Sequence, residues 1–217
     1  MAYTEEQVGR LSELLSLAEG QKRDGVLDYR AVPYLNEMER IVSEALDGCS
    51  DPSVISESFL VIRYLAEAYD RLGRFAVSAE YYKKAIELEL KLSPDERSSS
   101  DVREEIVYRA IKARNFYVDD DCEDILPAAR LLLGDGEAAS LFASALVRRR
   151  SLVHDPVEMT KEYLSVIDEV EREIAERRTV FGHGSCHEVW SLKTELLAER
   201  GIVWRSPAAL NPRVHFD

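Results

Sequence analysis

The sequence has few cysteines and no long apolar run. Its three cysteines, Cys49, Cys122 and Cys186, are widely spaced and odd in number. Disulfide frameworks use even numbers of cysteines at closer spacing, so this pattern is typical of a reducing compartment. No apolar run reaches the roughly 18 residues that a membrane-spanning helix needs, and the N-terminal MAYTEEQVGR lacks the apolar segment of a secretory signal. We therefore expect a cytoplasmic protein with no membrane partner.

Basic residues are scarce relative to acidic ones. The 217 residues include 28 Lys and Arg against 41 Asp and Glu, which gives a formal net charge of −13. Such a chain is repelled at long range by the phosphates of nucleic acids and by anionic lipids. Arg148, Arg149 and Arg150 are successive, and successive helical residues point in different directions. We therefore interpret them as the C-terminal end of a helix, where positive charge interacts favourably with the helix dipole. The charge thus argues against a nucleic-acid partner.

Several signatures of catalysis and of metal binding are missing. The sequence contains no phosphate-binding glycine loop, no G-x-S-x-G and no H-E-x-x-H. An acidic run has its carboxylates together, whereas a calcium-binding EF-hand loop needs spaced ligands and a central glycine; its members are Asp119, Asp120, Asp121, Glu123 and Asp124. We interpret this run as a solvated loop between helices, and we expect a protein without a cofactor and without catalytic activity of its own.

Helical periodicity fills most of the chain. Apolar residues recur three and four positions apart in segments that are separated by capping residues, glycine and proline. The predicted helices are residues 4–19, 29–46, 53–72, 75–92, 101–116, 125–133, 137–147, 156–178 and 185–200. Strand-like alternation is absent, so we predict an all-α fold in which antiparallel helix pairs stack as a short array. We place a helical domain at residues 1–180, and a C-terminal helix with a docked tail at 181–217 in the same structural unit.

The clearest helix pair is residues 62–92, IRYLAEAYDRLGRFAVSAEYYKKAIELELKL. Ala66 and Ala85 allow close helix approach, Tyr69 and Tyr82 fill the space between the helices, and Gly73 supplies a turn conformation that other residues resist. Over residues 59–92 this pattern resembles a tetratricopeptide (TPR) repeat. Ser78 stands where that family usually has alanine, and the closing proline comes late, at Pro94. Residues 101–133 have nearly the length of a second unit but lack its Leu-Gly turn.

The resemblance to TPR repeats implies a scaffold that binds a protein or peptide. First helices of such pairs usually line a concave face. The resemblance therefore assigns candidate binding roles to Arg63, Glu67, Asp70 and Arg71 on the helix at 53–72. The acidic balance of the chain favours a basic or neutral partner.

The C-terminal 37 residues, FGHGSCHEVWSLKTELLAERGIVWRSPAALNPRVHFD, have a different character. Ser185 and Glu188 are spaced as a capping box for the helix at 185–200. The tail is too apolar for a free disordered segment, so we expect it to be extended and docked on the helices; the anchors would be Ile202, Trp204, Leu210, Val214 and Phe216. Alternatively, the tail fills the binding groove, in cis or from a second subunit of a homodimer. The run also resembles a signature of bacterial proteins without an assigned activity, and it implies no function.

His183, Cys186 and His187 leave a different kind of function open, with Trp190 and Trp204 nearby in the sequence. The two histidines and the thiol could bind zinc or iron, with His215 as a fourth ligand. Cys186 near a helix N-terminus could instead act as a nucleophile, because the helix dipole favours the thiolate. The free amides of residues 185–188 could alternatively bind an anion. A structural role is the competing interpretation, with His187 hydrogen-bonded to the tail and Cys186 buried.

Overall fold

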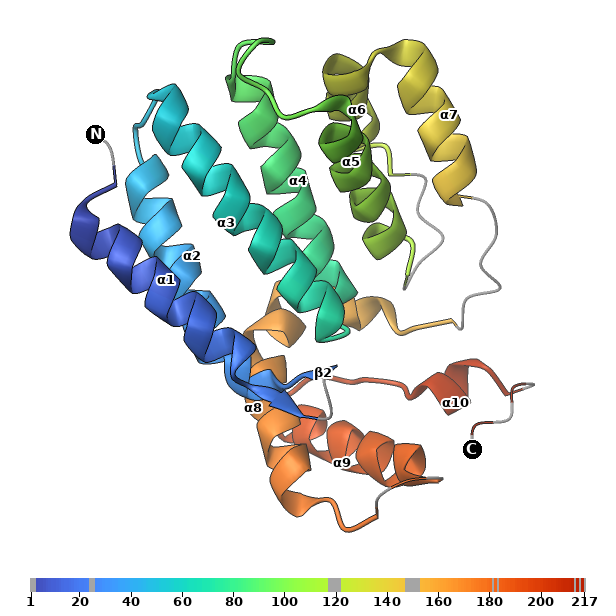
Figure 1. Cartoon of the computed structure of the whole chain (residues 1–217). Coiled ribbons are helices and arrows are strands. Elements are labelled where there is room, and N and C mark those ends of the chain that lie inside the picture. The colour runs from blue at the N-terminus through green and yellow to red at the C-terminus, as the bar shows by residue number, and fades with distance from the viewer. Residues whose placement is uncertain are drawn as a thin grey trace. The chain divides into compact units, whose positions relative to one another are not determined.

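The computed structural model of the chain is almost entirely helical (Figure 1). It describes residues 3–23, 26–116, 122–146, 153–180, 182, 184–212, 214 and 216. These residues contain ten α-helices and one two-stranded antiparallel ladder, in which β1 (Lys22–Arg23) pairs with β2 (Val26–Leu27). The all-α prediction is confirmed. The small ladder was not predicted, because strands of two residues carry no alternation.

The helices follow the predicted order closely. Their bounds are α1 (Glu5–Glu19), α2 (Val32–Leu46), α3 (Pro52–Arg71), α4 (Phe75–Lys91), α5 (Ser100–Arg114), α6 (Leu126–Leu133), α7 (Asp135–Leu146), α8 (Lys161–Arg177), α9 (Ser185–Glu199) and α10 (Pro207–Leu210). Short 3-10 helices η1 (Tyr29–Ala31) and η2 (Pro156–Met159) precede α2 and α8. The predicted helix at 156–178 is thus divided into η2 and α8, and the tail that we expected to be extended contains α10.

The chain divides into two compact units, residues 1–149 and 150–217, which we call unit 1 and unit 2. This division falls earlier in the chain than the boundary that we placed between residues 180 and 181. The reason is that α8 packs against α9, and the apolar faces of the two helices share one core with the tail. Helix α8 therefore belongs with the C-terminal segment. Within the described residues, no helix is both long enough and apolar enough to cross a membrane.

Local capping explains where the helices of unit 1 begin and end. Thr4 caps α1 through a reciprocal capping box, in which its hydroxyl accepts from the Gln7 N–H at 3.1 Å. The Asp51 carboxylate accepts from the Ser53 N–H at 3.0 Å, and proline follows at the first position of α3. Gly73 has a φ of 72°, which lets the chain reverse between α3 and α4. These signals are local, and the sequence therefore predicts them well.

Helices α3 and α4 pack closely against each other in unit 1. Ala66 and Ala85 are fully buried, and Tyr82 is 2% exposed between the helices. Ser78 is also fully buried, and its hydroxyl donates to the carbonyl oxygen of Ala66 at 2.9 Å. A hydroxyl at this position is therefore tolerated because the backbone of the facing helix satisfies it.

Successive helices of unit 1, from α1 to α7, pack against one another in chain order (Figure 1). Helix α2 contacts both α1 and α3, and α4 contacts both α3 and α5. We call α1, α3 and α5 the first helices, since each begins one of the successive helix pairs. Side chains reach directly between them: Glu19 of α1 contacts Arg71 of α3, and Asp70 of α3 contacts Arg109 of α5. The first helices are therefore neighbours on one side of unit 1.

Unit 2 is a pair of helices closed by the tail. Its core joins residues of α8 and α9 to two residues of the tail: Tyr163, Ile167, Val170, Ile174, Leu196, Leu197, Ile202 and Trp204. The prediction of a docked tail holds for Ile202 and Trp204, which are 8% and 4% exposed. Val214 is 44% exposed and is not an anchor. Asn211 fastens α10 through two 2.7 Å hydrogen bonds, one in each direction, with the backbone of Val153.

The predicted capping box of α9 is wrong. Gly184, with a φ of 81°, occupies the cap position, and Ser185 is already the first helical residue. The Glu188 carboxylate turns instead to the segment that follows α8, where it accepts from the Thr179 hydroxyl and from the Thr179 and Val180 N–H groups at 2.6–3.1 Å. These bonds hold the pKa of Glu188 below its ordinary value, the Thr179 hydroxyl contributing most.

Candidate functional site

The four predicted binding residues lie on α3, and each contacts a neighbouring charge. Arg63 donates from Nε to Glu67 at 3.0 Å, and its Nη2 lies 3.6 Å from a carboxylate oxygen of Glu105. The Asp70 carboxylate lies 3.6 Å from a guanidinium nitrogen of Arg109. Arg63, Glu67 and Asp70 therefore face α5, where they form a row of alternating charge with Glu105 and Arg109.

Arg71 faces the other first helix, α1. Its guanidinium donates to the Glu19 carboxylate at 2.5 Å, and the Tyr64 hydroxyl donates to the same group at 2.8 Å. The Arg71 guanidinium, together with Lys22 and Tyr64, lowers the pKa of Glu19 to about 2, although partial burial opposes the shift. The four predicted residues are thus divided between two seams of the first-helix side.

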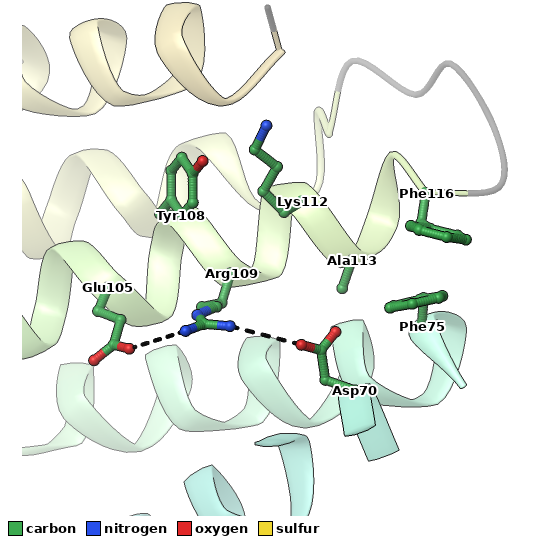
Figure 2. A pocket seen from close by; sticks show the side chains of 8 residues that line it. All are labelled: Asp70, Phe75, Glu105, Tyr108, Arg109, Lys112, Ala113 and Phe116. Atoms are coloured by element: carbon green, nitrogen blue, oxygen red, sulfur yellow. Dashed lines mark ion pairs between the residues drawn. The ribbon is translucent and has the colours of Figure 1, made fainter. Parts of the chain in front are cut away.

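A pocket of about 510 Å³ opens along the seam between α3 and α5 (Figure 2). It is lined by Asp70, Phe75, Glu105, Tyr108, Arg109, Lys112, Ala113 and Phe116. Figure 2 shows the Arg109 guanidinium between the carboxylates of Glu105 and Asp70, with the rings of Phe75 and Phe116 beyond Asp70. These two rings are stacked, and the Lys112 ammonium lies 5.4 Å from the centre of the Tyr108 ring. The pocket combines aromatic surface with an equal number of acidic and basic groups.

Arg109 is held loosely in this pocket. Its guanidinium nitrogens lie 3.6 Å from Asp70 and 3.5 Å from Glu105, which is longer than a charge-assisted hydrogen bond. Among the residues that the structure describes, Arg109 donates no hydrogen bond to either carboxylate. Partly exposed ion pairs of this kind contribute about 0–1 kcal/mol each. A ligand group could therefore replace one of them at little cost.

Beneath this row of charges lies the hydroxyl of Tyr82. It is buried, and it has no hydrogen-bond partner within the described part of the chain. Burial raises the pKa of Tyr82, while the charges of Arg109 and Asp70 act on the same hydroxyl in opposite directions. A polar group that can still accept or donate a hydrogen bond thus lies close to the loosely paired charges.

Sequence reasoning found Asp70 but missed the part of the pocket that α5 supplies. Glu105, Arg109 and Lys112 are spaced four and three residues apart, which places them on one helical face. That spacing was readable in the sequence. Residues 101–133 lack the Leu-Gly turn on which the resemblance of residues 59–92 to a TPR repeat depends, so the resemblance does not point to α5.

The cluster predicted near the start of α9 is only partly described. His183 lies outside the described residues, and so does His215. His187 Nε2 lies 3.3 Å from the Phe216 carbonyl oxygen, as the structural interpretation expected. Cys186 is half-buried and not buried as that interpretation required.

Aromatic contacts join this end of α9 to the tail. The Trp190 ring packs edge-on against the rings of His187 and Phe216, at centroid distances of 5.4 and 5.0 Å. Trp204 makes different contacts, with Glu158 and Lys193. Among the residues that the structure describes, no group of three or more His, Cys, Asp or Glu side chains is placed to hold a metal ion.

The acidic and basic runs considered from the sequence also lie largely outside the described residues. Asp119, Asp120 and Asp121 do so, as do the arginines at 148–150. Asp124 is described, and its carboxylate accepts from Lys83 at 2.9 Å and from Arg114 at 2.6 Å. It therefore ties the segment before α6 to α4 and α5.

Unit 2 has a buried polar cluster that sequence reasoning did not find. Glu158 is 6% exposed and accepts a hydrogen bond from the Trp204 indole N–H. Asp155 is 5% exposed and accepts from the backbone N–H and from Nε of Arg205, at 2.8 and 3.0 Å. Burial raises the pKa of Glu158, whereas the bonds from Arg205 and Val157 outweigh burial and lower that of Asp155. These contacts fasten the tail to η2 and are structural in character.

No protein-family model matches the chain, and neither a curated protein nor a solved structure matches it.

Proposed function

We propose that unit 1 is a TPR-like scaffold that binds a protein or peptide segment on its first-helix side. The observation that carries the proposal is the pocket between α3 and α5, with its aromatic surface and loosely held charges. The proposal assigns the protein no reaction of its own. The cysteine pattern supports a cytoplasmic setting for this binding.

The pocket has the features that peptide recognition needs. Phe75, Phe116 and Tyr108 offer rigid apolar area, which binds a ligand with little loss of side-chain entropy. Arg109 and Lys112 offer donors that are not consumed by close ion pairs among the described residues. A peptide would bury the rings, and its polar groups would replace weak ion pairs within the protein. The net free energy of binding would therefore come mainly from the aromatic surface.

Selection from a random peptide-display library against the full-length protein tests the proposal. Enriched peptides would be synthesised, and their affinities would be measured for the wild-type protein, Arg109→Ala and Tyr108→Ala. Both variants should bind at least about tenfold more weakly, the loss expected when a residue at the centre of an interface is truncated. Thermal denaturation would confirm that both variants remain folded.

Arg130→Ala provides a matched control. Arg130 lies on α6 outside the pocket, and its guanidinium is paired just as loosely, with Asp135 at 3.7 Å. This variant should bind the selected peptides like the wild type. The proposal would be wrong if no peptide were enriched, or if Arg109→Ala and Arg130→Ala bound the enriched peptides equally well.

A further inference from the structure

Part of the first-helix side is apolar and open to solvent. Leu60, in the middle of α3, is 61% exposed, and Val8 and Leu15 of α1 are 52% and 39% exposed. Val8 and Leu15 are seven residues apart, so they lie on one face of α1, and Glu19 follows on the same face. Leu60 shares a face of α3 with Tyr64 and Arg71 by the same spacing. Each helix thus presents an apolar stripe that ends at charged residues.

The two stripes lie on adjoining helices. Glu19, at the end of the α1 stripe, accepts hydrogen bonds from Tyr64 and Arg71 on the α3 stripe. We call the surface formed by Val8, Leu15, Leu60 and Tyr64 the α1–α3 face. It is distinct from the pocket, which opens along the seam between α3 and α5.

The charges that border the α1–α3 face are unbalanced. Its basic side chains are engaged: Arg71 is paired with Glu19, and Arg63 with Glu67 and Glu105. Glu57 is exposed three residues before Leu60, and it makes no ion pair within the part of the chain that the structure describes. The charge still available to a partner here is therefore negative, in keeping with the formal charge of −13 of the whole chain.

We propose that the α1–α3 face binds an amphipathic segment whose polar positions are lysine or arginine. This inference rests on the proposed scaffold function and specifies the chemistry of its partner. Apolar side chains of the segment cover Leu60, Leu15 and Val8, while its basic side chains reach Glu57. Complementary charge sets the orientation and the rate of association, and the apolar contacts supply most of the affinity.

Two synthetic peptides of about 16 residues test the charge requirement. Both have leucines at the same helical spacing, so they share one apolar face and differ only in charge. One peptide has lysine at its polar positions and the other has glutamate. Fluorescence anisotropy of the labelled peptides is measured with the full-length protein at low and at physiological ionic strength. The lysine peptide should bind, more weakly at higher salt, and the glutamate peptide should bind at least about tenfold more weakly.

Paired variants test the location. Leu60→Asn should weaken binding of the lysine peptide about tenfold, as expected for the loss of one buried leucine contact. Leu131→Asn should have no effect, because Leu131 is 72% exposed but lies on α6. Glu57→Lys should weaken binding, whereas Glu87→Lys, at an exposed position of α4, should leave it unchanged. Unchanged circular dichroism and unfolding midpoints would confirm that all four variants fold.

The inference would be overturned if the glutamate peptide bound as tightly as the lysine peptide, if neither bound, or if the control variants weakened binding as much as their partners did. Peptides from the display library separate this failure from that of the scaffold function. If the lysine peptide fails to bind while enriched peptides still depend on Arg109, the scaffold function stays in place and only the partner chemistry proposed for the α1–α3 face is removed.

Discussion

Replacing Trp204 with alanine should nearly unfold unit 2 and leave unit 1 folded. Trp204 is 4% exposed in the core of unit 2, and its indole N–H donates to the buried carboxyl of Glu158. Truncation of a buried tryptophan to alanine costs about 3–5 kcal/mol, and leaving Glu158 without its donor costs about 1–3 kcal/mol more. A unit of this size is stable by about 3–10 kcal/mol. The expected loss is therefore comparable with the whole stability of unit 2.

Guanidinium titration monitored by two signals checks this result. Both tryptophans, Trp190 and Trp204, lie in unit 2, so the fluorescence of Trp190 in the variant reports on that unit alone. Far-UV circular dichroism reports mainly on the helices of unit 1. The fluorescence transition of Trp204→Ala should move to much lower denaturant, while most of the dichroism is lost at the wild-type midpoint. Trp204→Phe, which keeps most of the ring and loses the N–H, should be intermediate. An unchanged fluorescence midpoint in Trp204→Ala would refute the role given to the tail.

Three smaller changes test other parts of the fold. Burial raises the pKa of Glu158 above its ordinary value of 4.5, so unit 2 should lose stability as the pH rises from that value. Glu158→Gln should remove this loss. The prediction would be contradicted if the fluorescence midpoints of the wild type and of Glu158→Gln stayed parallel from about pH 5 to pH 8. Ser78→Ala should lower the stability of unit 1 by about 1 kcal/mol in a denaturant titration, because the buried hydrogen bond from the Ser78 hydroxyl to the Ala66 carbonyl is lost. A stabilised variant would contradict this. Gly73→Ala should also lower the stability of unit 1 by about 1 kcal/mol, since a side chain disfavours the φ of 72°. An unchanged dichroism midpoint would count against the turn geometry.

The fold was largely predictable because its signals are local. Apolar periodicity gave the helices from α1 to α9 within a few residues, except that the last turn before α8 is the separate 3-10 helix η2. The Thr4 cap and the Gly73 turn depend on residues no more than a few positions away. The predictions that failed concern residues that are farther apart in the sequence. Glu188 bonds to Thr179, nine residues earlier, instead of completing a capping box with Ser185.

The candidate site was less predictable for the same reason. The TPR resemblance placed Asp70 on the first-helix side, but a single helix pair cannot show that Arg109 of α5 lies opposite it. The boundary between the units likewise depends on α8 packing against α9. Periodicity shows that α8 has an apolar face, but it does not show which helix covers that face. Sequence periodicity thus predicts which face of a helix is buried, and the structure is needed to show which helix covers it.

The central claim is that the first helices of unit 1 form the binding surface. Amide hydrogen exchange of the full-length protein, with and without a saturating peptide from the display selection, tests it most directly. The account predicts slower exchange in α3, in α5 and in the first turn of α4, where Phe75 lines the pocket, with little change in α2 and in the rest of α4. Protection confined to α2 and α4, or to residues 150–217, would contradict it.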